Sequence, residues 1–148
     1  MVLTRPPSVS ATRRMRGRSA PGSRCALVAG ADAQIRQLLR TVLEIGGFEV
    51  IEAGSQGDVL SRLSSTARIP HVVVLDVALP HFSGIATLSF MRREPRLCEV
   101  PVVVLTSFAD PPEQTRFRQS GATAVVGKPF SAQRLLDTVH TLAGSRPL

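Results

Sequence analysis

The sequence of 148 residues contains no tryptophan, no tyrosine and only two cysteines, Cys25 and Cys98. Two cysteines cannot form the disulfide framework of a small secreted domain, so we interpret both as free thiols. The absence of tryptophan and tyrosine argues against a flavin site, which needs large aromatic side chains for stacking. No apolar run reaches the roughly 20 residues of a membrane-spanning helix, and no apolar export signal follows the N-terminal arginines. We therefore expect a cytoplasmic protein without membrane contact.

Acidic residues are absent from residues 1–24, which contain six arginines and many Pro, Ser and Gly residues. Such a segment has too little apolar surface to offset its ordering entropy, so we predict a disordered basic leader. The rest of the chain carries all 11 acidic residues and is nearly neutral. We therefore expect no nucleic-acid binding by the rest of the chain, and any such binding only through this leader.

Residues 25–143 alternate short apolar runs with segments of helical periodicity, which predicts one domain followed by a short tail, 144–148. Expected strands are 25–29, 48–53, 71–75, 102–105 and 123–126, and expected helices lie near 35–43, 59–63, 84–93, 111–119 and 131–142. Strict alternation with short connections predicts an α/β fold. We expect a flavodoxin-like, doubly wound, five-stranded parallel sheet in the order 2-1-3-4-5.

Three polar side chains stand at predicted strand ends: Asp76, Thr106 and Lys128, which is the only lysine of the chain. The carboxyl ends of parallel strands meet at one edge of a sheet, where ligands bind. A carboxylate can accept a phosphoryl group covalently, and a lysine can neutralise phosphoryl oxygens. The pattern therefore predicts a phosphoryl site centred on Asp76.

Four motifs in this order resemble the response-regulator receiver domain of two-component signalling. They are 72–80 (VVVLDVALP) with Gly84, 101–106 (PVVVLT), Gly121-Ala122, and 127–130 (GKPF). The resemblance implies that Asp76 accepts phosphate from a histidine kinase, that Thr106 moves to bind it, and that Lys128 bridges to it. It also implies a cis peptide between Lys128 and Pro129, and a loop after Asp76 shaped by Pro80 and Gly84.

The sequence departs from the family where the first strand ends. The family's adjacent acidic pair, which holds magnesium, corresponds to Gly30 and Ala31. Of the usual ligands, Asp76 and the backbone carbonyl of Ala78 remain, so we expect no certain cofactor and at most weak magnesium binding. Asp32 lies one place later, where it suits a helix N-cap and is a weak candidate metal ligand.

The residue three before the lysine is Val125 rather than an aromatic residue, which argues against output through aromatic rotation. Ala78 stands where aspartyl phosphatases carry their second acid, so we expect no enzymatic turnover.

Five residues after Ala143 leave no room for an output domain. We therefore expect a stand-alone atypical receiver that acts as a protein-interaction module, with impaired magnesium-dependent phosphorylation of Asp76. The alternative is a functional single-domain regulator phosphorylated on Asp76 by a histidine kinase. Expected partners are a histidine kinase or a downstream signalling protein, contacting Phe117, Val125 and the exposed side of the last helix. The sequence does not decide whether the chain forms a homodimer.

Overall fold

The structure is a computed structural model that describes residues 24–65, 68–77, 84–108 and 110–144. The expected leader up to residue 23 and the end of the expected tail lie outside these ranges. The elements are β1 (Arg24–Ala29), α2 (Ala33–Ile45), β2 (Phe48–Ala53), α3 (Gln56–Ser65), β3 (Val72–Asp76), α4 (Gly84–Arg93), β4 (Val102–Thr106), α5 (Pro111–Gln119), β5 (Ala124–Gly127) and α6 (Ala132–Gly144).

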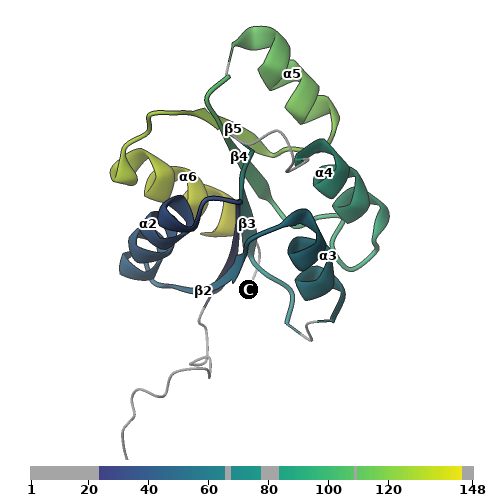
Figure 1. Cartoon of the computed structure of the whole chain (residues 1–148), viewed down its shortest axis with the longest axis horizontal. Coiled ribbons are helices and arrows are strands. Elements are labelled where there is room, and N and C mark those ends of the chain that lie inside the picture. Colours follow the sequence, from purple (N-terminus) through teal and green to yellow (C-terminus); the bar gives the residue numbers. More distant parts are fainter. Residues whose placement is uncertain (1–23, 66–67, 78–83, 109, 145–148) are drawn as a thin grey trace, which may run out of the picture.

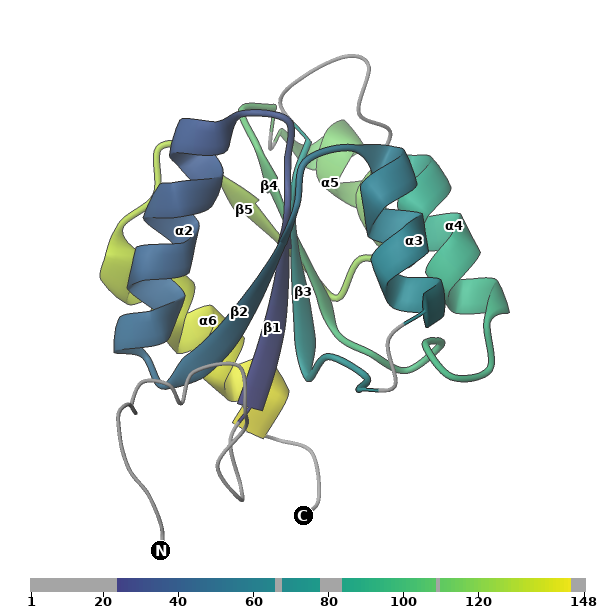
Figure 2. The same cartoon turned by 60° about the horizontal axis from the view of Figure 1, so that its bottom comes forward.

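The five strands form one parallel sheet in the order β2-β1-β3-β4-β5. Helices α2 and α6 cover one face, and α3, α4 and α5 cover the other (Figures 1 and 2). The predicted flavodoxin-like fold is confirmed, and no strand bound differs from the prediction by more than one residue.

Strands β3 and β4 are buried along their whole length, as their uninterrupted apolar sequences predicted. Val73 and Leu75 of β3 join the cluster beneath α3, α4 and α5, whereas Val72 and Val74 join the cluster beneath α2 and α6. Alternate side chains of a strand point to opposite faces, so one apolar run supplies both halves of the core.

Helix α2 begins and ends at residues suited to those positions. The Oδ1 atom of Asp32 accepts hydrogen bonds from the backbone N–H groups of Gln34, at 2.8 Å, and Ile35, at 3.4 Å. This confirms Asp32 as the N-cap. At the other end Gly47 has a φ of +97°, a conformation that favours glycine.

One residue of the predicted apolar face of α2 is exposed. Leu39, Val42 and Leu43 lie in the core, but Leu38 is 51% exposed. Each residue turns the helix by about 100°, so Leu38 is rotated away from the face centred on its neighbour Leu39.

No helix of the described ranges combines the length and apolar character that a membrane crossing requires.

Candidate functional site

The three sequence-predicted residues Asp76, Thr106 and Lys128 meet at the carboxyl edge of the sheet. Asp76 is the last residue of β3, Thr106 is the last of β4, and Lys128 directly follows β5. Asp76 pairs in register with Leu105, and Thr106 pairs with Gly127. The backbone N–H of Lys128 donates to the carbonyl of Thr106 at 2.8 Å. Strand register therefore holds all three residues at one edge.

Asp76 and Lys128 form an ion pair across the end of β4. The Nζ atom of Lys128 lies 2.5 Å from Oδ1 of Asp76, and the Asp76 side chain is only 5% exposed. A carboxylate this buried needs a compensating charge, because removing it from water is costly. Lys128 supplies that charge.

Thr106 is buried, and its Oγ1 atom accepts a hydrogen bond of 3.0 Å from the backbone N–H of Phe108. A hydroxyl can accept and donate at the same time, so Thr106 keeps a proton for a further acceptor. The same side chain thus holds the start of the β4–α5 loop at the carboxyl end of the sheet.

Gly30, directly after β1, lies against Asp76. A β-carbon built on Gly30 would stand 2.9 Å from Cβ of Asp76, which is closer than carbon atoms pack. The Gly30 carbonyl accepts a hydrogen bond of 2.7 Å from Nη1 of Arg36, whose Nε atom also donates to Glu52 at 3.2 Å. The end of β1 therefore presents backbone, not a side chain, to the carboxylate of Asp76.

The structure does not place two residues of the predicted site, Ala78 and Pro80. Both lie outside the described residues. Asp32 is placed, and its Oδ1 atom is engaged at the N-terminus of α2, so a metal-ligand role for it stays a prediction. Within the described ranges, no three His, Cys, Asp or Glu side chains gather in a way that could hold a metal ion.

The peptide bond between Lys128 and Pro129 is cis, as the family resemblance implied. The partner surface expected around Phe117, Val125 and the exposed side of α6 stays a prediction, but the first two side chains are not exposed parts of it. Phe117 and Val125 are only 6% and 8% exposed, because both pack into the core cluster beneath α5. The burial of Phe117 fixes α5 to the sheet.

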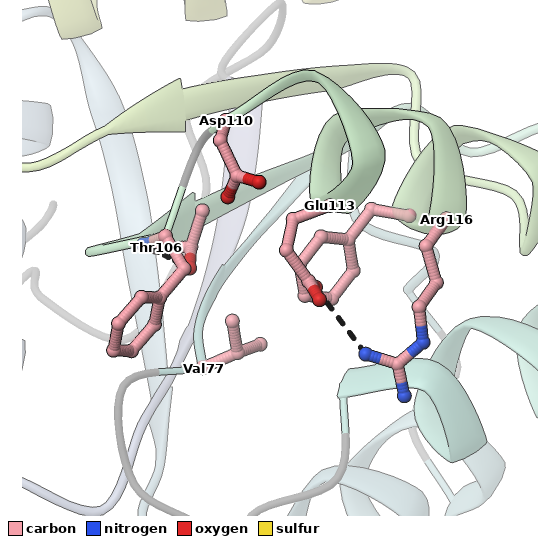
Figure 3. Close-up of a pocket in the computed structure, with 7 residues that line it drawn as sticks. Val77, Thr106, Asp110, Glu113 and Arg116 are labelled. Atoms are coloured by element: carbon pink, nitrogen blue, oxygen red, sulfur yellow. Dashed lines mark hydrogen bonds and ion pairs between the residues drawn. The ribbon is translucent and has the colours of Figure 1, made fainter.

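Sequence reasoning missed a pocket of about 420 Å³ between α5 and the ends of β3 and β4 (Figure 3). Its lining residues are Val77, Thr106, Phe108, Asp110, Glu113, Arg116 and Phe117. One sequence signal for it exists in Asp110-Pro111-Pro112. A capping aspartate normally bonds to N–H groups of the first turn, and proline lacks one.

A sheet in the order 2-1-3-4-5 with an aspartate, a threonine and a lysine at three successive strand ends defines a class of signalling module built around a phosphoryl-accepting carboxylate. The model of the response regulator receiver domain family matches residues 26–140, and the chain belongs to that family. Receiver domains are regulatory modules of two-component signalling that interact with histidine kinases and downstream proteins.

Known relatives agree with this assignment. The polar-differentiation response regulator DivK of Brucella anthropi is 30% identical over 108 residues, which cover 73% of this chain and 86% of DivK. The fold is similar to that of a putative response regulator from Chloroflexus aurantiacus, with a TM-score of 0.75 and 26% identity over 82% of this chain and 98% of that one. The Francisella response regulator 1452 receiver domain gives a TM-score of 0.73 at 26% identity, over 82% of this chain and 97% of its own.

Proposed function

We propose that this chain is an atypical receiver that acts by docking to a protein partner, and whose Asp76 is phosphorylated poorly with magnesium. The observation that carries the proposal is the contact between Gly30 and Asp76. Where an acidic side chain would share a metal with the acceptor, Gly30 has no side chain and no room for a β-carbon.

The charges around Asp76 support the same proposal. Magnesium requires a near-octahedral set of hard oxygen ligands. The described carboxylates here are Asp76, which is paired with Lys128, and Asp32, which caps α2. This donor set does not fit magnesium, and we derive no phosphoryl-transfer step through the metal.

A second candidate function is a regulator phosphorylated on Asp76 by a histidine kinase. The observation in its favour is that Asp76, Thr106 and Lys128 lie together at the acceptor edge. The two functions differ in one measurable respect, which is the metal-dependent modification of Asp76.

The test uses the full-length chain and follows its backbone amide resonances during titration with magnesium and then beryllofluoride. We expect the amide resonances near Asp76 to shift only slightly and without saturating. We also expect little phosphorylation by acetyl phosphate. Asp76→Asn is the control that cannot be phosphorylated. The variant Gly30→Asp/Ala31→Asp supplies the missing carboxylates, and it should gain magnesium binding only if the ends of β1 and β3 move apart to admit the new β-carbon at position 30. Its spectrum is therefore first checked for a folded domain.

Saturable magnesium binding by the unaltered chain, with beryllofluoride shifts that disappear in Asp76→Asn, would overturn the proposal. The phosphorylated regulator would then stand. Stoichiometric labelling of Asp76 by acetyl phosphate would lead to the same conclusion.

A further inference from the structure

The pocket between α5 and the ends of β3 and β4 combines two carboxylates with apolar walls. Asp110 and Glu113 enter it from the start of α5, and Val77, Phe108 and Phe117 form its apolar lining. In Figure 3 the carboxyl group of Asp110 points into the space above Val77, and that of Glu113 lies at the side of this space and is directed toward Arg116. The chemistry of this pocket is therefore acidic at one side and apolar at the other.

The carboxylate of Asp110 is available to a ligand. Asp110 is the N-cap residue of α5, yet its side chain makes no capping hydrogen bond. The first two positions of the helix are Pro111 and Pro112, which have no N–H to donate. Asp110 is also exposed, so a ligand can reach its carboxylate from solvent.

The carboxylate of Glu113 is only partly engaged. Its Oε1 atom lies 3.3 Å from Nη1 of Arg116, whose side chain is 62% exposed. An exposed ion pair of this kind contributes about 0–1 kcal/mol, so a competing cation can share or replace it. Arg116 lies at the rim and leaves the space between Glu113 and Asp110 open (Figure 3).

The apolar wall contains an aromatic ring that is open to a partner. Phe108 is 68% exposed, whereas Phe117, deeper in the pocket, is 6% exposed. An exposed phenyl ring beside two carboxylates suits a guanidinium, which stacks on aromatic faces and binds carboxylates in a bidentate manner. A lysine ammonium would gain the charge interaction but not the planar stacking.

An anionic ligand fits this pocket poorly. The N-terminus of a helix attracts anions through its free N–H groups. In α5 the first two of those groups are missing, and Asp110 and Glu113 place negative charge at the same end. The charge of the pocket therefore selects a cation.

We propose that this pocket binds an arginine side chain that a partner protein presents next to an apolar residue. This inference rests on the proposed docking function and names the chemistry of the partner. The guanidinium lies between Asp110 and Glu113, and its aliphatic stem and apolar neighbour cover Phe108 and Val77.

The same pocket is connected to the acceptor site through Thr106. Thr106 lines the pocket, and its Oγ1 atom accepts the hydrogen bond from the N–H of Phe108. A partner that holds Phe108 therefore also favours the present position of Thr106. Because coupling between two sites is reciprocal, a change at Thr106 alters the affinity of the pocket in turn.

The experiment titrates the full-length chain, without metal or phosphoryl donor, with the peptide acetyl-Leu-Arg-Leu-amide. Its matched probe is the same peptide with citrulline, which keeps the shape of arginine but carries no charge. We expect the arginine peptide to shift the amides of Thr106, Phe108 and Glu113 saturably, and the citrulline peptide to bind about tenfold more weakly.

The variants Asp110→Asn and Glu113→Gln should each weaken binding of the arginine peptide several-fold. The control is Asp137→Asn, which removes an exposed carboxylate on α6 and should leave the affinity unchanged. Equal binding of the two peptides, or shifts confined to other surfaces, would overturn the proposal. It would also be overturned if glutamine replacements of the arginines in residues 1–23 shifted the same pocket amides without peptide, since the chain's own leader would then fill the site. Tight magnesium binding would refute the proposed function and leave these outcomes intact.

Discussion

Lys128 reaches across the end of β4 and places its Nζ atom 2.5 Å from Oδ1 of the buried Asp76. Removing one partner of a buried pair leaves an uncompensated charge, which typically costs about 3–5 kcal/mol. We therefore expect Lys128→Met to lower the free energy of unfolding by about 3 kcal/mol, measured by urea denaturation. The double variant Asp76→Asn/Lys128→Met should recover most of that loss. A single-variant loss below about 1 kcal/mol, the range of exposed pairs, would contradict the pairing.

Gly30→Ala tests the close approach of β1 to Asp76. The added β-carbon would lie 2.9 Å from Cβ of Asp76, an atom fixed close to its backbone, so the strand ends must move apart. We expect a loss of about 1–3 kcal/mol in unfolding free energy, as for other overpacked sites. The matched control is Gly57→Ala on α3, where the nearest atom is 4.0 Å away. Better helix propensity should stabilise that variant by up to about 1 kcal/mol. Equal effects at the two glycines would contradict the contact.

Arg92 at the end of α4 holds two loops together through their carbonyls. Its guanidinium donates to Val100 at 2.8 Å, to Cys98 at 3.0 Å and to Gly121 at 2.7 Å. Burial among these groups lowers the pKa of Arg92. Because an ammonium cannot reproduce this planar arrangement, Arg92→Lys should cost about 2 kcal/mol in chemical denaturation. The exposed neighbour Arg93 provides the control, and Arg93→Lys should change the stability by less than about 0.5 kcal/mol.

Glu52 makes stability depend on pH in the acid range. A hydrogen bond from Arg40, together with a second from Arg36, holds the pKa of Glu52 below its ordinary value of 4.5. The folded state therefore favours the ionised carboxylate. Its contribution is fully present above pH 4.5 and is lost as the pH falls through the lowered folded-state pKa. Glu52→Gln should flatten this part of the stability–pH curve, and Asp137→Asn should leave it unchanged. An identical acid slope in Glu52→Gln would refute the assignment.

The sequence predicted the strand order and the meeting of Asp76, Thr106 and Lys128 at one edge of the sheet, because both depend on local patterns. Apolar runs ending in Asp76 and Thr106 specify buried parallel strands, and parallel strands bring their carboxyl ends together. The sequence was less informative about which side chains of α5 and β5 are buried. The periodicity marked Phe117 as the inward residue of its helix, but it did not show that Phe117 and Val125 are both buried in the same core cluster.

The pocket was missed for a similar reason. It depends on how far the β4–α5 loop stands from β3, a distance that no periodicity encodes. The contact of Gly30 with Asp76 could not be predicted from the sequence either. The sequence showed that position 30 has no carboxylate, but not that the structure has no room there for a β-carbon.

Local stability should differ between α5 and α2. In α5 the only buried side chain is Phe117, whereas α2 buries Leu39, Val42 and Leu43. Fewer buried apolar contacts mean a lower free energy of local opening, and amide exchange reports that opening directly. We expect the amides of residues 113–119 to exchange faster than those of 35–43, measured by hydrogen–deuterium exchange at neutral pH.

Two variants connect this difference to packing. Phe117→Leu should speed exchange throughout 113–119, because a smaller side chain in the same space leaves a cavity. Leu38→Ala, at an exposed position of α2, should change exchange in 35–43 little. If residues 113–119 instead exchange more slowly than 35–43, then α5 is held by more than Phe117. The α5 end of the pocket would then be a rigid, preformed binding surface. It would not be a surface that becomes ordered only when the partner binds.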